Sequence, residues 1–147
     1  MDELPFIQDP AEFSNHLKAL KAHRGANKNK TARKYSLSKK DKIAILEKTD
    51  YKCHICGGTV ALNAFEADHI QAHSSTVNNK LDNFLPSCRL CNNYRWHYDP
   101  EEIKWILKLG VWMRGQIRTD TSLGKAAAEK FIKHELRREG RKTPKNK

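Results

Sequence analysis

The chain has no apolar run of about 18 residues, and its first residues lack the pattern of positive charge, apolar stretch and small residues that marks a secretory signal. We therefore expect neither a transmembrane helix nor a signal peptide, and we expect a cytoplasmic protein. Acidic residues are also few, with 17 Asp and Glu against 28 Lys and Arg, and the net charge is +11. Such a chain is expected to bind a polyanion, because Lys and Arg contacts to phosphates supply most non-specific affinity for nucleic acids.

The positive charge lies on both sides of a nearly neutral middle. Residues 18–42 hold ten Lys and Arg against one acid, and residues 101–147 hold thirteen against six, whereas residues 43–100 hold five against six. Solvated helix faces carry such charge, and so do surfaces that follow a phosphate backbone. Residues 25–34 are predicted to be a linker or an arm along a phosphate backbone. Four residues of this segment are predicted to contact the nucleic acid: Lys28, Lys30, Arg33 and Lys34.

Cysteine is scarce, but the four cysteines form two C-x-x-C knuckles, Cys53 with Cys56 and Cys88 with Cys91. Two disulfides would suit a secreted protein, whereas paired thiols in a reducing compartment favour a metal. Four thiolates complete the tetrahedral coordination of zinc and leave no position for water. We therefore predict a structural Zn²⁺ ion that stabilises a small core and takes no part in catalysis.

Helix signals flank the knuckles. N-cap residues with acids in the first turn predict helices that begin near residues 10, 39 and 100, and a fourth that begins near 121. The first two should end near residues 23 and 49, and Gly110 is expected to end or bend the third. Four side chains are expected on the buried face of the last helix: Ala126, Ala127, Phe131 and Ile132. Three tryptophans are expected to be core or packing residues rather than residues that stack on bases: Trp96, Trp105 and Trp112.

Between the knuckles, residues 59–62 and 65–68 alternate enough for a two-stranded hairpin that turns at residues 63–64. His69 would then lie at or just after the end of the second strand, and a short helix is expected over residues 92–97. The predicted fold class is α+β. It comprises an N-terminal helix and basic linker over residues 1–38, a core over 39–98, and a helical extension with a basic tail over 99–147.

Hydrolysis of a phosphodiester requires a base for water, a cation that stabilises the developing charge, and ligands that leave the cation open to substrate. Asp68, His69 and Asn92 meet these requirements if zinc brings the strand end close to the second knuckle. One carboxylate and one amide suit a hard cation such as Mg²⁺ or Mn²⁺, which keeps several waters for phosphate to displace.

Four segments resemble the zinc-stapled HNH endonucleases: residues 53–57 (CHICG), 67–70 (ADHI), 82–85 (DNFL) and 88–93 (CRLCNN). The resemblance covers about residues 40–97. It implies a ββα-metal fold, in which a hairpin and a helix surround one divalent ion, and metal-dependent hydrolysis of DNA to 5′-phosphate and 3′-hydroxyl ends. DNA would enter the active site largely through its minor groove side.

The resemblance also implies roles by position. His69 matches the general base, and Asp68 matches the ligand of the divalent ion. Asn83 matches an asparagine that braces the loop carrying the base. Asn92 stands where many members have histidine, which gives an H-N-N variant with an amide oxygen as ligand. Arg95, one helical turn further on, matches a basic residue that is directed at a phosphate.

Other side chains remain alternatives for these roles. His73 is a candidate for a DNA contact or for the base. His97, which would lie about one helical turn beyond Arg95, is a further candidate for these roles. Asn93 could replace Asn92 as ligand. His54, inside the first knuckle, is expected to be exposed. A competing interpretation is a non-catalytic zinc-ribbon module that binds nucleic acid, which explains the cysteines and the basic arms but gives the Asp-His pair no role.

The biological setting is predicted from the small size of the chain. A restriction-type role is the first expectation, because small stand-alone nucleases of this family occur among restriction enzymes. Cleavage of both strands is easiest with two active sites. We therefore expect a homodimer built by the C-terminal helices.

Overall fold

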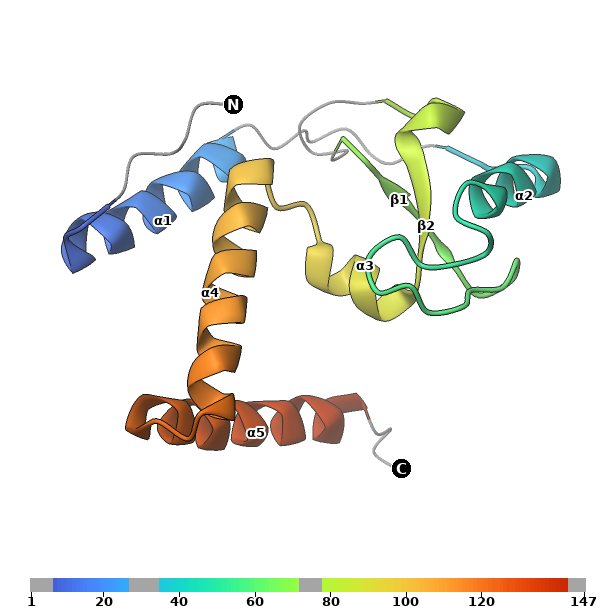
Figure 1. Ribbon diagram of the computed structural model, residues 1–147. Helices are drawn as coiled ribbons and strands as arrows, with labels where there is room; N and C mark the ends of the chain where they lie inside the picture. Colours follow the sequence, from blue (N-terminus) through green and yellow to red (C-terminus); the bar gives the residue numbers. More distant parts are fainter. Residues whose placement is uncertain (1–6, 27–34, 72–77, 143–147) are drawn as a thin grey trace. The chain divides into compact units, whose positions relative to one another are not determined.

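A computed structural model describes residues 7–26, 35–71 and 78–142. Its elements in chain order are α1 (Pro10–Ala26), α2 (Lys39–Glu47), β1 (Glu66–His69), the 3-10 helix η1 (Leu81–Asn83), β2 (Phe84–Ser87), α3 (Arg89–Arg95), α4 (Pro100–Arg118) and α5 (Ser122–Lys142) (Figure 1). The predicted α+β class is confirmed. The chain divides into two compact units, residues 1–103 and 104–147. None of the helices in the described ranges is long and apolar enough to cross a membrane.

The sheet consists of β1 and β2, which pair antiparallel with Glu66 opposite Ser87 and His69 opposite Phe84. α2 packs against β2, and α3 packs against β1 (Figure 1). The predicted position of His69 at the end of a strand is confirmed. Because Ser87 lies opposite Glu66 and β2 leads within two residues into α3, the register places the second knuckle next to the start of β1, and α3 then packs against β1.

The predicted partner of this strand is wrong. Residues 59–62 form one isolated bridge, between Thr59 and Lys52, and the strand that pairs with β1 is β2. The backbone N–H of Val60 donates to Tyr51 O, and that of Cys53 donates to the carbonyl oxygen of Gly58. The segment therefore closes the first knuckle, and its hydrogen-bonding groups are used there.

The predicted helix starts are confirmed at residue level. Asp9 Oδ1 accepts from the N–H of Glu12 at 2.8 Å, and Ser38 and Asp41 form the capping box of α2. α4 begins at Pro100. Thr121 Oγ1 accepts from Gly124 N–H at 3.0 Å, so it caps α5. Capping side chains were therefore sufficient to predict where each of these four helices begins.

Glycine has opposite roles in α4 and α5. The expectation that Gly110 ends or bends the third helix is wrong in its first part, because α4 continues through it to Arg118. At Gly124 a side chain is excluded, since a Cβ there would lie 2.1 Å from the carbonyl oxygen of Gln116. Gly124 therefore permits α5 to start close to the end of α4.

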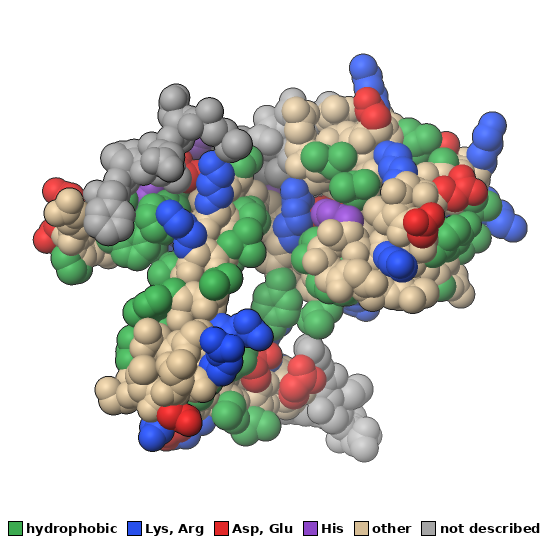
Figure 2. Space-filling model, viewed as in Figure 1, with side chains coloured by type: hydrophobic (Ala, Val, Ile, Leu, Met, Phe, Trp, Pro, Cys, Tyr) green, Lys and Arg blue, Asp and Glu red, His purple; other side chains and the backbone are tan. Residues whose placement is uncertain are grey.

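The expected buried face of the last helix is wrong. Phe131 and Ile132 are 61% and 57% exposed, and Trp96 and Trp112 are also about half exposed rather than in a core. Figure 2 shows hydrophobic side chains at the surface of α4 and α5. Helical spacing identifies an apolar face, but it does not identify what covers that face.

The hydrophobic core of the first unit lies around the cysteines. Leu46, Cys53 and Val60 are buried together, and partly buried side chains pack against them: Leu62, Phe65, Cys88 and Cys91. Within the described residues this apolar cluster is small, so a metal that joins its cysteines would supply a large share of its stability.

Candidate active site and metal centre

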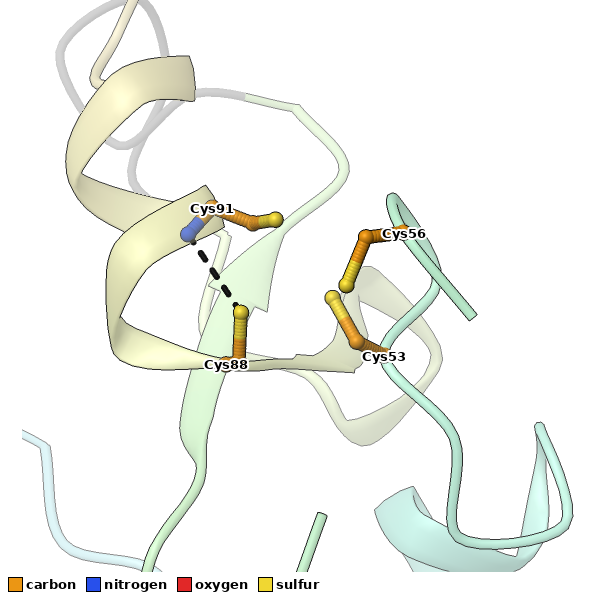
Figure 3. A group of neighbouring side chains, drawn as sticks. All are labelled: Cys53, Cys56, Cys88 and Cys91. Carbon is orange, nitrogen blue, oxygen red and sulfur yellow. Dashed lines mark hydrogen bonds between the residues drawn. The ribbon is translucent and has the colours of Figure 1, made fainter. Parts of the chain in front are cut away.

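The four cysteine side chains converge from two segments that are distant in sequence. Cys53 and Cys56 lie in the loop after α2, whereas Cys88 and Cys91 lie at the start of α3 (Figure 3). All four are free thiols, and their Sγ atoms lie within 4.8 Å of one another. Tetrahedral zinc with Zn–S bonds of about 2.3 Å requires sulfur separations of about 3.8 Å. The predicted cluster is therefore confirmed as a group positioned to bind a metal, and its donors fit zinc.

The thiols differ in acidity. Burial raises the pKa of Cys53, but hydrogen bonds from the backbone of Cys56, Cys88 and Ile55 outweigh burial and lower this pKa to about 6. Burial, followed by hydrogen bonds with Cys88 and Cys56, raises the pKa of Cys91 well above its usual range. Binding of four thiolates to zinc must therefore release protons, including that of Cys91.

A cleft of about 420 Å³ lies between β1 and α3. Asp68 and His69 line it from β1, and Asn92 and Arg95 line it from α3. Tyr35 lines it from the segment before α2. The structure thus brings the expected base, carboxylate, amide and arginine to one cavity.

Asp68 is 5% exposed, and both of its carboxylate oxygens have partners. Arg95 Nη1 donates to Oδ1 at 2.8 Å, and His54 Nε2 lies 2.8 Å from Oδ2. Arg95 Nη2 also donates to the backbone oxygen of Ile70 at 3.1 Å. Burial of a carboxylate is costly unless cationic or hydrogen-bonding groups compensate it. These two contacts therefore compensate the buried carboxylate and fix its orientation.

His69 is 6% exposed, and its ring is fixed on several sides. Nε2 lies 3.0 Å from Asn79 Oδ1. In the tautomer that carries its proton on Nε2, the ring donates to this amide oxygen, and Nδ1 is then the nitrogen that can accept a proton. The imidazole packs against Phe84 at a centroid distance of 4.5 Å and meets the ring of Tyr35 edge-on at 5.3 Å. Its orientation is therefore set before any substrate binds.

Asn83 joins the two ends of the loop that follows β1. Its Oδ1 accepts from Gln71 N–H at 2.9 Å, and its Nδ2 donates to the carbonyl oxygen of Asn78 at 2.8 Å and to that of Gln71 at 3.3 Å. The backbone oxygen of Asn83 accepts from Ile70 N–H at 2.8 Å. These hydrogen bonds hold together the two ends of the loop that directly follows His69. Asn83 is 5% exposed, so water has little access to its amide and competes little for these hydrogen bonds.

The wall of the cleft beyond α3 contains a strained residue. Trp96 has φ 47°, in the left-handed region that costs a non-glycine residue about 1–3 kcal/mol. Its ring stacks on His97 at 3.8 Å, and the guanidinium of Arg24 lies 4.6 Å from the ring centre. Arg24 also donates to Glu102 Oε2 at 2.7 Å. α1 is thereby connected to this wall.

Some contacts in the site were not predicted from the sequence, and several predicted DNA contacts belong to residues that the structure does not describe. His54 was expected to be exposed, but its side chain is 18% exposed and contacts Asp68, so that expectation is wrong. Tyr35 and Asn79 carry no motif that would identify them as neighbours of His69. The remaining predicted DNA contacts lie outside the described residues: Lys28, Lys30, Arg33, Lys34 and His73.

Comparison with known proteins identifies the class of this site. Residues 53–95 match the family model described as HNH endonuclease. The matched segment contains both knuckles, β1, β2 and α3, together with most of the cleft. The match covers these residues alone and supports, in general terms, a nuclease-type function that acts on nucleic acid. No curated protein and no solved structure matches the chain.

Proposed function

We propose that the chain is a metal-dependent, restriction-type DNA endonuclease that hydrolyses phosphodiester bonds to 5′-phosphate and 3′-hydroxyl ends. One observation carries the proposal: Asp68, His69 and Asn92 line a single cleft inside the segment that matches the HNH family. A base, a carboxylate and an amide in one cavity are the groups that ion-assisted hydrolysis requires.

Each residue has a distinct task in this proposal. His69 accepts the proton of the attacking water at Nδ1, and its hydrogen bond to Asn79 fixes that tautomer. Asp68 and Asn92 provide the carboxylate and amide oxygens that hold Mg²⁺ or Mn²⁺. When bound, such an ion supplies the positive charge that stabilises the phosphorane and the departing 3′-oxygen. Asn83 keeps the loop after His69 in place through its backbone contacts.

The competing function is a zinc ribbon that binds nucleic acid without cleaving it. Such a module needs the cysteines and the basic surface, but it does not need a buried carboxylate beside a buried histidine. In such a module Asp68 and His69, which lie side by side in the lining of the cleft, would have no role. We therefore favour the nuclease.

The ends of the products test the reaction class. A labelled duplex is incubated with the protein and Mn²⁺, and the nicks are then treated with DNA ligase, with or without prior phosphatase. Hydrolysis with a departing 3′-oxygen leaves nicks that ligase seals directly and that phosphatase makes unsealable. Products that need removal of a 3′-phosphate before sealing would contradict the proposed direction of bond breakage.

In the cleavage-deficient His69→Ala background with Mn²⁺, in which the ion takes the place of Arg95 at Asp68, Arg95→Ala should weaken DNA binding and reduce the salt dependence of the affinity. Each lost phosphate contact lowers the slope of log K against log salt by about 0.9 for duplex DNA. Arg89→Ala is the matched control, because Arg89 is an exposed arginine of the same helix outside the lining of the cleft. An unchanged slope for Arg95→Ala, measured by fluorescence anisotropy, would show that Arg95 binds no phosphate.

We also propose that the protein forms a homodimer through apolar side chains of residues 104–142. Val111, Phe131 and Leu136 are each more than 60% exposed, and exposed apolar surface of this kind marks an interaction site. Phe131→Gln with Leu136→Gln should shift sedimentation from dimer to monomer, whereas Lys130→Gln on the same helix should not. A wild-type chain that sediments as a monomer with and without DNA would contradict the dimer.

A further inference from the structure

His54 belongs to the first knuckle, yet its side chain reaches the carboxylate of the cleft. Its Nε2 lies 2.8 Å from Asp68 Oδ2, and its side chain is 18% exposed. Its backbone N–H donates to the carbonyl oxygen of Pro86 at 2.9 Å, and Pro86 is paired with Ala67 in the sheet. The backbone of His54 is therefore fixed to the sheet beside the residue that precedes Asp68.

The two partners of Asp68 have different access to substrate. Arg95, on Oδ1, lines the cleft, whereas His54, on Oδ2, is not among the described residues that line it. A divalent cation that enters from the cleft is therefore expected to bind Oδ1, the oxygen that Arg95 contacts. His54 can keep its hydrogen bond during this exchange, and Arg95 is then available for a phosphate.

We propose that His54 is a positioning residue for the divalent ion: it holds Oδ2 of Asp68 so that Oδ1 remains directed into the cleft when the ion replaces Arg95. This inference rests on the proposed function. Since Cys53 and Cys56 flank His54, the contact also connects the structural zinc site to the catalytic ion. Partners that orient a metal ligand in this way change metal affinity or activity by about 10- to 100-fold when removed.

Three variants separate positioning from folding. His54→Leu removes the hydrogen bond and places an apolar side chain in the space of the imidazole. His54→Gln offers an amide donor that reaches a similar distance, so it should restore most of the ion affinity. Ile55→Ala is the matched control, because Ile55 lies in the same knuckle and is 46% exposed. Zinc content should match the wild type in all three, whereas His54→Leu should lower the unfolding temperature, because it leaves the buried Oδ2 of Asp68 without a partner.

The experiment is titration calorimetry of Mn²⁺ into zinc-retaining protein without DNA, with Asp68→Asn as the reference. We expect His54→Leu to weaken Mn²⁺ binding by about 10- to 100-fold, His54→Gln to bind nearly as tightly as wild type, and Ile55→Ala to bind like wild type. Cleavage assays at saturating Mn²⁺ should then show a smaller defect for His54→Leu than assays at limiting Mn²⁺.

The outcomes are distinguishable. Wild-type Mn²⁺ affinity in His54→Leu, together with lost binding in Asp68→Asn, would overturn the role of His54 and leave the proposed function intact. Loss of zinc along with Mn²⁺ in His54→Leu, or a Gln variant as weak as the Leu variant, would also overturn it. Wild-type Mn²⁺ binding by Asp68→Asn would instead show that the ion site of the proposed function is wrong.

Discussion

His69→Ala should reduce the rate of DNA cleavage by about 10²- to 10⁴-fold, the usual contribution of a positioned general base. DNA affinity should remain nearly unchanged, because His69 is 6% exposed and offers little surface to a phosphate. The loss should appear in the single-turnover rate at saturating protein, measured on a labelled duplex with Mn²⁺. Addition of free imidazole should recover part of the rate, since it can occupy the space left by the side chain.

A structural explanation for such a loss must be separated from loss of the base. His69 packs against Phe84 and Tyr35, so its removal also leaves a small void in the sheet. His97→Ala is the matched control, because it removes the other described histidine that lines the cleft. If His69→Ala cleaves at the wild-type rate, or if His97→Ala alone abolishes cleavage, the base has been misassigned.

Removal of zinc should unfold the region around the cysteines. Structural zinc contributes about 10–16 kcal/mol in small zinc domains, whereas a whole domain is stable by about 5–15 kcal/mol. The buried cluster contains Leu46, Cys53 and Val60, and two of the zinc cysteines from α3 pack against it. After treatment with a strong chelator, the amide protons of Ile45 and Leu46 should lose their protection from hydrogen exchange.

A chelator too weak to extract zinc is the control for this experiment. It should remove the catalytic ion and abolish cleavage while hydrogen exchange at Ile45 and Leu46 stays slow. Retained protection at these amides after complete loss of zinc, verified by elemental analysis, would contradict a stabilising role for the metal.

Acid should weaken zinc binding in a defined direction. The pKa of Cys53 is lowered to about 6 from an ordinary value of 9.0. A lowered pKa in the folded state contributes stability that is fully present above the ordinary value and is lost as pH falls toward about 6. Cys91 has a raised pKa, so its proton competes with the metal at all moderate pH values. The zinc affinity should therefore fall steadily with decreasing pH.

The features that depend on local motifs could be predicted from the sequence. The knuckles predicted the cysteine cluster, and the capping residues Ser38 and Asp41 predicted the start of α2. The proximity of Asp68 and Asn92 was predicted on the condition that zinc brings the strand end close to the second knuckle, and both residues line one cleft. In the structure the pairing of β1 with β2 also brings α3 against β1.

Contacts between residues far apart in the sequence could not be predicted from these local motifs. β2 contains Pro86, which lacks a donor for a strand ladder, so alternation favoured residues 59–62 instead. His54 looked exposed because its neighbours in the chain are zinc ligands, and its contact with Asp68 depends on a register set by β1 and β2. The apolar face of α5 was visible as a pattern, but helical spacing carries no information about its partner.

The most direct test of the account is incubation of zinc-retaining protein with supercoiled plasmid in Mg²⁺, Mn²⁺ or EDTA, with Asp68→Asn alongside. The account predicts conversion to nicked, linear or discretely fragmented DNA with a divalent ion, and none in EDTA or with the variant. Retardation of the plasmid without cleavage in any ion would contradict a nuclease and favour the binding module. Cleavage that persists in EDTA would contradict ion-assisted hydrolysis at Asp68 and Asn92.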